Sequence, residues 1–352
     1  MGLTVRHEVL HLSLRDPFRI ARTEDHSSDG VTTVIVELTA DGLEGLVGVG
    51  EGYPDRFYGE TPETMAVVFP LLLDAIERNG AFEPTVEGLV AAGSAMERAI
   101  RGHGAAKCAV DIALHDLVGK ALGRPVHRLL SLSPELPPTD FTIGIDEPLV
   151  VAERARRAAQ FPALKIKVGG PGDLETLEAV RGVFLGPIRV DANTGWTPDA
   201  AIALLPELER LGVELIEQPF PARRLDQMAW LQARSSLPIV ADESCVLPED
   251  LDGLVGVVAG VNVKLAKCGG IGPARRMLER ARELGLRTFL GCMEETSVGI
   301  AGSAVVASLA DWVDLDGCLL LADDPFEGLD LDSDHRWILT DRPGLGLSRA
   351  AT

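Results

Sequence analysis

The chain has 352 residues, of which 46% are hydrophobic, and this length accommodates a barrel of about 250 residues beside a smaller domain. Its 53 acidic and 33 basic side chains give a formal net charge of −20, so we expect it to bind neither nucleic acid nor an anionic membrane. Five widely spaced cysteines, without a CxxC pair, indicate reduced thiols in a cytoplasmic protein.

Residues 1–124 are predicted to form an N-terminal α+β domain. VTTVIVELT at 31–39 is rich in β-branched residues and predicts a strand, and a helical region extends from Pro62 to about Gly123. The clearest helix covers 105–122, where small and apolar residues recur at helical spacing until a glycine and a proline end it.

From Phe141 onward, short apolar runs alternate with amphipathic segments, which is the pattern of parallel strands joined by crossover helices. No full helix follows the last run, so the sequence predicts a modified TIM barrel of the (β/α)7β type over residues 125–320. Residues 321–352 read as loops and short strands that we expect to return to the N-terminal capping domain. The eight predicted strands are FTIGI, ALKIKVG, PIRVDAN, VELIEQPF, PIVADES, GVNVKLAK, RTFLGCM and DWVDLDG.

Polar residues end these runs at a nearly constant interval. The steps from Lys167 to Asp191, Glu217, Asp242 and Lys267 are 24, 26, 25 and 25 residues, each about one strand–helix unit. Residues that recur at the same point of each unit lie on the same end of a barrel. The carboxyl-terminal end of the strands is where such barrels hold their active sites.

Three of these residues, Asp191, Glu217 and Asp242, are carboxylates from successive strands. Three hard oxygen ligands, with positions left for water and substrate, suit Mg²⁺, and we expect one ion per subunit. Zinc fits less well, because none of the seven histidines lies at the end of a predicted barrel strand.

Lysines flank this predicted site on both sides. Only six of the 33 basic residues are lysines, and four of them, Lys165, Lys167, Lys264 and Lys267, lie in two apolar runs. A buried lysine can release its proton, whereas arginine cannot. Lysines on both sides of a metal indicate removal of a proton next to a carboxylate, an enediolate stabilised by the metal, and return of the proton from the other face.

The motifs KIK, VDANTGW, IEQP, ADES and NVKLAKCGG together resemble the enolase superfamily in its muconate-lactonizing subgroup. The similarity spans nearly the whole chain, including PFRIAR near residue 20, GVGEGYPDRFYGET at 48–61 and PGLG at 343–346. The resemblance implies that Lys167 is a general base or acid, that Lys267 is its counterpart, and that Lys165 tunes the field around Lys167. It also implies that the three carboxylates hold the metal.

VDLDG at 313–317, with GCMEETS before it, looks like the dipeptide epimerases. This implies that Asp314 and Asp316 hold the α-ammonium of a dipeptide, whose C-terminal residue is inverted at its α-carbon. The alternatives are an N-succinylamino acid racemase, an o-succinylbenzoate synthase or a muconate cycloisomerase of the same subgroup, and a non-catalytic metal- or ligand-binding protein. A homo-oligomer is expected.

Substrate side chains in this subgroup meet the loops around residues 20–30 and 50–60. Arg22 would favour a glutamate side chain, whereas Asp25, together with Glu294, would favour a cationic one. A neutral or hydrophobic preference is the alternative to the cationic one, and the acidic preference ranks third.

Overall fold

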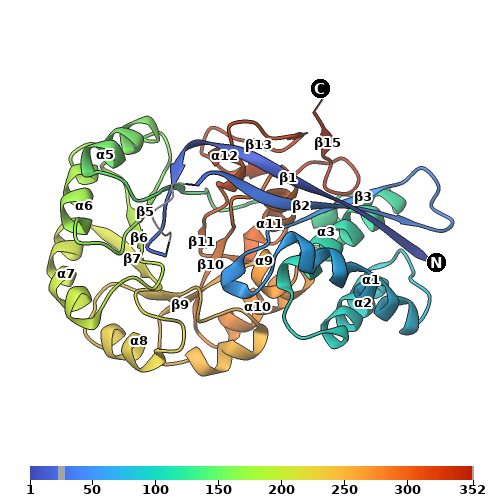
Figure 1. Cartoon of the computed structure of the whole chain (residues 1–352), viewed down its shortest axis with the longest axis horizontal. Coiled ribbons are helices and arrows are strands. Elements are labelled where there is room, and N and C mark those ends of the chain that lie inside the picture. The colour runs from blue at the N-terminus through green and yellow to red at the C-terminus, as the bar shows by residue number, and fades with distance from the viewer. Residues whose placement is uncertain (23–27, 351–352) are drawn as a thin grey trace.

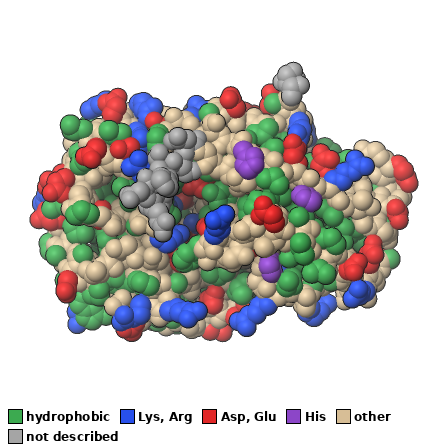
Figure 2. All heavy atoms as spheres, viewed as in Figure 1, with side chains coloured by type: hydrophobic (Ala, Val, Ile, Leu, Met, Phe, Trp, Pro, Cys, Tyr) green, Lys and Arg blue, Asp and Glu red, His purple; other side chains and the backbone are tan. Residues whose placement is uncertain are grey.

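The computed structural model describes residues 1–22 and 28–350 and contains a three-stranded sheet, a group of helices beside it, and an eight-stranded barrel (Figure 1). The fold class predicted from the sequence is confirmed. On the face drawn in Figure 2, basic and acidic side chains are interspersed, and neither sign forms a continuous patch.

The N-terminal sheet is antiparallel and joins β1 (Leu3–Phe18), β2 (Ser28–Ala40) and β3 (Gly48–Gly52) in that order. Helices α1 (Pro62–Arg78), α2 (Val86–Ala99) and α3 (Gly104–Ala121) follow. The glycines of β3 let α3 lie directly against the sheet, since a Cβ atom at Gly50 would be 2.0 Å from the carbonyl oxygen of Ala109. The helix predicted at 105–122 is therefore confirmed as α3.

The eight predicted barrel strands are all present and parallel, and each pairs with its neighbour in chain order. Thr139 and Val313 form a parallel bridge between the two edges of the sheet, and the Asp140 amide donates to the Val313 carbonyl at 3.1 Å, which closes the barrel. The strands are β4 (Phe141–Ile143), β5 (Leu164–Lys167), β6 (Ile188–Asp191), β7 (Val213–Glu217), β8 (Ile239–Ala241), β9 (Gly260–Lys264), β10 (Arg287–Gly291) and β11 (Trp312–Val313).

The crossovers between these strands are mostly helical. They contain α5 (Pro148–Arg157), α6 (Asp173–Arg181), α7 (Pro198–Arg210), α8 (Leu225–Gln232), the 3-10 segment η2 (Pro248–Leu254), α9 (Leu265–Cys268), α10 (Ile271–Glu283), α11 (Ser297–Ala304) and the 3-10 segment η3 (Ala307–Leu309). Only the short helix α12 (Gly317–Leu320) follows β11, as expected for a barrel without a full eighth helix.

The end of the chain forms short strands and lies against earlier parts of the molecule. These strands are β12 (Phe326–Glu327), β13 (Asp330–Leu331), β14 (Trp337–Ile338) and β15 (Ser348–Arg349). The Ala322 amide donates to the Ser13 carbonyl of β1 at 2.8 Å, and the Leu345 amide donates to Asp116 of α3 at 2.8 Å. The tail thus contacts the N-terminal sheet and its helices.

All five cysteines are buried and none forms a disulfide. Among residues 1–22 and 28–350, the helices lack the combination of length and hydropathy that a membrane span requires.

Candidate active site

The carboxyl-terminal ends of neighbouring barrel strands carry the polar residues of the site. Lys167, Asp191 and Glu217 are the last residues of β5, β6 and β7, and they are direct partners across the parallel ladder. Asp242 directly follows β8. Because parallel strands in register end together, these four residues lie on one end of the barrel, which we call the rim. The constant spacing in the sequence predicts this arrangement.

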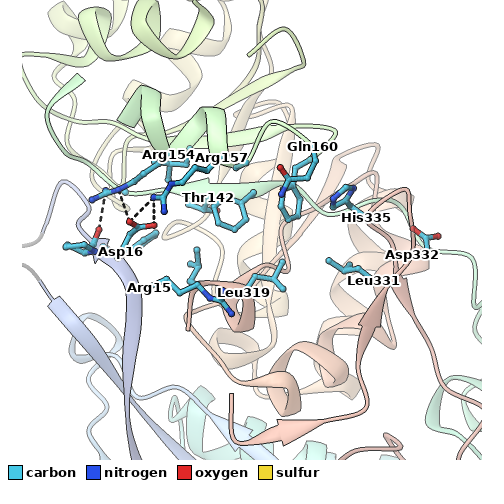
Figure 3. Close-up of a pocket in the computed structure, with 18 residues that line it drawn as sticks. Arg15, Asp16, Thr142, Arg154, Arg157, Gln160, Leu319, Leu331, Asp332 and His335 are labelled. Atoms are coloured by element: carbon cyan, nitrogen blue, oxygen red, sulfur yellow. Dashed lines mark hydrogen bonds and ion pairs between the residues drawn. The ribbon is translucent and has the colours of Figure 1, made fainter. Parts of the chain in front are cut away.

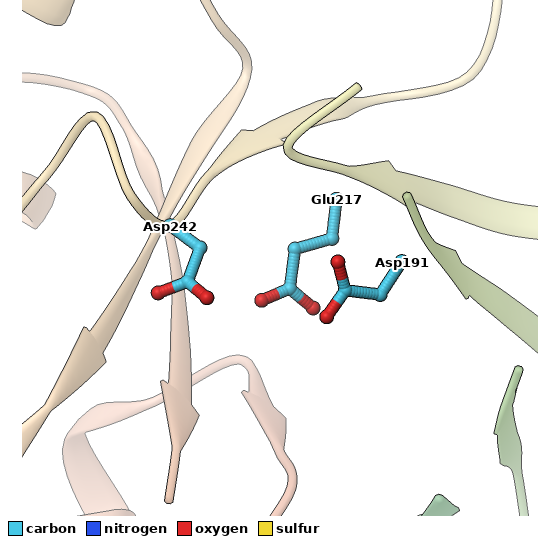
Figure 4. A group of neighbouring side chains, drawn as sticks. All are labelled: Asp191, Glu217 and Asp242. Atoms are coloured by element: carbon cyan, nitrogen blue, oxygen red, sulfur yellow. The ribbon is translucent and has the colours of Figure 1, made fainter. Parts of the chain in front are cut away.

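The three carboxylates meet at the rim (Figure 4). Each of Asp191, Glu217 and Asp242 offers a ligand oxygen that lies within 4.8 Å of the other two, and all three side chains are buried. Burial and the nearby charge of Asp191 raise the pKa of Glu217 to about 7. Glu217 Oε2 accepts no hydrogen bond from the described residues. Three crowded carboxylates with an oxygen left free fit a hard divalent cation such as Mg²⁺.

The two lysines of β5 have different partners. Lys167 Nζ donates to Asp191 Oδ2 at 2.7 Å, beside the three carboxylates. Lys165 Nζ donates to Asp314 and lies 3.6 Å from Glu217 Oε2. Burial opposes the charge of Lys165, but Asp314 and Glu217 outweigh it and raise the pKa of this lysine. Lys165 therefore stays charged inside the barrel.

The other two lysines lie on the opposite side of the carboxylates. β9 ends at Lys264, whose Nζ donates to Asp242 Oδ2 at 2.9 Å. Lys267 lies in the single turn α9, so the prediction that it ends a strand is wrong. Its Nζ donates to the carbonyl oxygens of Asp242 at 2.7 Å and of Cys245 and Asn262 at 2.9 Å. Lys267 is 2% exposed, and its ammonium group holds the loop after β8 in place.

A cavity of about 680 Å³ opens over the rim, between the barrel and the N-terminal sheet. Lys167 and Lys264 both line it, and Lys165 and Lys267 are not among its lining residues. The barrel contributes Lys167, Asn193, Asp242, Lys264, Cys292, Met293 and Glu294, and the N-terminal part contributes Leu14, Phe18, Ile20, Arg22, Val31, Tyr53, Pro54, Asp55, Arg56 and Tyr58.

Asp314 and Asp316 follow β11 and are not among the residues that line this cavity. Each is 2% exposed. Thr142 Oγ1 donates to Asp314 at 3.0 Å, and the Thr142 amide donates to Asp316 at 2.5 Å. Burial and the charge of Asp314 raise the pKa of Asp316 to about 8. In this arrangement Asp314 accepts from Lys165 and from the Thr142 hydroxyl, and Asp316 accepts from the Thr142 amide.

The residues considered for substrate specificity are only partly described. Arg22 lines the cavity, where its guanidinium forms an ion pair with Glu243. Glu294 also lines the cavity, and the Tyr53 hydroxyl hydrogen-bonds with it. Asp25 lies outside the described residues.

Sequence reasoning did not single out three residues that the structure places around the rim. Glu243 directly follows Asp242 and lies in the ADES motif. Asn193 lies two positions after Asp191, in the VDAN motif. Tyr53 lies in the loop after β3. Their motif positions were the available signal, but nothing in the local sequence connects them with Arg22 or Glu294.

A second cavity, of about 380 Å³, lies on the outside of the barrel between β4, α5 and the tail (Figure 3). Its wall is largely apolar, and at one end Asp16 forms ion pairs with Arg154 and Arg157. It contains none of the rim carboxylates or lysines, so we assign the candidate active site to the cavity over the rim.

These features define a class of metal-assisted barrel enzyme: a closed parallel barrel, a capping sheet, and buried carboxylates with lysines on both sides. Two family models match the chain: "Mandelate racemase / muconate lactonizing enzyme, N-terminal domain" over residues 2–131 and "Enolase C-terminal domain-like" over residues 150–350. The chain belongs to the enolase superfamily, in its mandelate racemase and muconate lactonizing enzyme branch.

Proteins similar to this chain include several dipeptide epimerases. The chain is 38% identical to an L-Ala-D/L-Glu epimerase of Bacteroides thetaiotaomicron, over 96% of this chain and 86% of that protein. It is 35% identical to an L-Lys-D/L-Arg epimerase of Methylococcus capsulatus, over 96% of both chains. The crystal structure of an Enterococcus faecalis dipeptide epimerase with Mg and L-Leu-L-Tyr matches with a TM-score of 0.89 at 33% identity, covering 99% of this chain and 100% of that chain.

Proposed function

We propose that this protein is a Mg²⁺-dependent dipeptide epimerase that inverts the α-carbon of the C-terminal residue. The observation that carries the proposal is the position of two lysines, Lys167 and Lys264, in the wall of one cavity. They come from β5 and β9, and the strands between them supply the three carboxylates. A substrate held over the carboxylates would meet one ammonium or amine from each side.

The metal site would consist of Asp191, Glu217 and Asp242. When bound there, Mg²⁺ supplies positive charge that makes the proton next to the substrate carboxylate more acidic. Lys167 and Lys264 would then move the proton: one takes it from the α-carbon, and the other delivers a proton to the opposite face. Lys264 replaces Lys267 in this role, because Lys267 is occupied by backbone carbonyls away from the cavity. Lys165 would hold its positive charge beside Lys167, as first expected.

The test is exchange of the α-proton in D₂O. A panel of L,L-dipeptides is incubated with the protein and Mg²⁺, and NMR follows deuterium at each α-carbon and the appearance of the second diastereomer. Deuterium should enter only the C-terminal residue. Absence of exchange in every dipeptide would overturn the proposal.

N-succinylamino acid racemisation is the second candidate, and one observation favours keeping it. Asp314 and Asp316 are buried and do not line the cavity, so this pair of carboxylates is not free to bind a dipeptide ammonium. N-succinylamino acids, which lack that ammonium, belong in the same panel. Faster exchange in these compounds than in all dipeptides would favour the racemase.

Three further expectations remain proposals. Buried, unpaired cysteines support a location in the reducing cytoplasm. Homo-oligomerisation is tested by light scattering of the purified protein. The domain division at residues 124 and 320 is tested by limited proteolysis, which should cut first near these positions.

A further inference from the structure

Among residues 1–22 and 28–350, four charged side chains of the cavity lie outside the metal and lysine set: Arg22, Arg56, Asp55 and Glu294. They decide the charge that a substrate side chain meets. Their influence depends on the partners that each already has, because a charge neutralised by a neighbour contributes little to selecting a ligand.

Arg22 already has an anionic partner on the barrel. Its Nη1 donates to Glu243 and, at 3.3 Å, to the Asn193 carbonyl. Its guanidinium carbon lies 4.3 Å from the centre of the Phe57 ring, so the flat group is held on one face as well. The side chain of Arg22 is 25% exposed and that of Glu243 is 1% exposed.

Glu243 depends on this guanidinium. Among the described residues its other hydrogen-bond donor is the neutral amide of Asn193, at 3.3 Å from Oε1, and Oε2 has no partner. A buried carboxylate without a compensating charge is costly. If Arg22 turned to a substrate carboxylate, Glu243 would lose its only ion pair within the described residues and keep the Asn193 amide and the charge of Lys264, which lies farther away.

The remaining cavity charges favour a cation. Glu294 has a neutral neighbour, the Tyr53 hydroxyl. Asp55 accepts a hydrogen bond from the Phe57 amide at 2.7 Å, so its hydrogen-bond partner is neutral as well. Against these two carboxylates stands Arg56, which is exposed and forms no ion pair within the described part of the chain.

We propose that Glu243 determines substrate specificity by neutralising Arg22, so that the cavity selects a dipeptide with a cationic C-terminal side chain over one with an acidic side chain. This inference rests on the proposed epimerase function. Glu243 is a positioning residue here, because it acts on the substrate through Arg22.

The experiment compares kcat/KM for Ala-Lys, Ala-Glu and Ala-Phe at one ionic strength. The wild type should prefer Ala-Lys to Ala-Glu by about ten-fold or more, which corresponds to one favourable charge contact. In Glu243→Gln the freed guanidinium should raise kcat/KM for Ala-Glu about ten-fold relative to Ala-Phe and lower it for Ala-Lys. The double variant with Arg22→Gln should lose that gain.

Two controls separate this effect from damage to the site. Arg56→Gln removes the other guanidinium of the same cavity, and Glu243→Gln should still favour Ala-Glu in its presence. Calorimetry measures Mg²⁺ binding to each variant, because Glu243 adjoins Asp242. Should Glu243→Gln fold poorly, Arg22→Gln alone carries the test, since it should leave kcat/KM for Ala-Glu unchanged relative to Ala-Phe, whereas a selective loss for Ala-Glu would overturn the inference.

Two results would overturn the inference. The first is that the wild type prefers Ala-Glu and that Arg22→Gln lowers kcat/KM for Ala-Glu selectively. The second is that Glu243→Gln changes kcat/KM equally for all three dipeptides. Neither result touches the epimerase proposal, which fails only if no dipeptide exchanges its α-proton.

Discussion

Lys264 and Lys267 are three residues apart, yet their ammonium groups have different surroundings. Lys264 ends β9 and lines the cavity, and it shares Asp242 with its neighbour. Lys267 donates to three backbone carbonyls, of which only that of Asp242 is also shown accepting from the Cys245 amide, at 2.9 Å. A buried carbonyl that loses its hydrogen-bond donor lowers the free energy of unfolding of the protein. We therefore expect Lys264 to act in catalysis and Lys267 to stabilise the rim.

We predict opposite effects for the two alanine variants. Lys264→Ala should lower epimerisation by at least about a thousand-fold, as expected when a catalytic acid or base is removed, with a modest change in Tm. Lys267→Ala should lower the free energy of unfolding by about 3–5 kcal/mol, because it removes one partner from a buried network. Urea unfolding and NMR-monitored exchange measure the two quantities. If Lys264→Ala kept full activity while folded Lys267→Ala lost it, the assignment of the second base would revert to Lys267.

At the scale of elements, α11 connects the barrel to the N-terminal sheet through its first turn. Glu51 of β3 accepts hydrogen bonds from the Thr296 amide at 3.0 Å and from the Gly299 amide at 2.8 Å, where a carboxylate complements the positive end of the helix. Glu295 is buried beside it, and its Oε1 has no partner within residues 1–22 and 28–350. Burial and the charge of Glu51 raise the pKa of Glu295 from 4.5 to about 8.

This raised pKa predicts a loss of stability in mild alkali. The folded protein keeps the Glu295 proton that the unfolded chain releases, so the contribution is complete below pH 4.5 and is lost as the pH rises through about 8. Glu295→Gln replaces the side chain by one of nearly the same shape that cannot ionise. Its free energy of unfolding should therefore fall less than that of the wild type between pH 5 and pH 8.5, with a Tm about 2–4 °C higher at the upper end. Glu249→Gln, an exposed acid, is the control, and parallel pH profiles for wild type and Glu295→Gln would contradict the prediction.

At the scale of the whole molecule, the three rim carboxylates come from successive strands of a barrel whose two edges meet at Thr139, Asp140 and Val313. Lysines already compensate Asp191 and Asp242, but burial and the charge of Asp191 raise the pKa of Glu217, so a bound cation should stabilise the folded protein further. A ligand that binds only the folded state stabilises it in proportion to the logarithm of its concentration, by about 2.7 kcal/mol at one hundred times Kd.

Mg²⁺ should therefore raise Tm, and EDTA should reverse the rise and abolish α-proton exchange. Glu217→Gln should melt at the same temperature as the wild type or higher without metal, because it removes a carboxyl whose pKa is already raised to about 7. The same variant should lose most of the rise caused by Mg²⁺. Differential scanning calorimetry with and without Mg²⁺ measures both, with Asp226→Asn, which changes an exposed acid, as the control. Activity that survives complete chelation would contradict the metal assignment.

The sequence by itself determined the barrel, its eight strands and the positions of the three carboxylates, because these features repeat with each strand–helix unit and need only local pattern. The same regularity misplaced Lys267, since the interval of 25 residues continued past the true end of β9 at Lys264. Only the tertiary structure decided which ammonium groups face the cavity. It also decided that Arg22 meets Glu243, 221 residues away, and that Asp314 meets Lys165. Such partners depend on how the N-terminal sheet and distant strands pack together, and no local spacing records that packing.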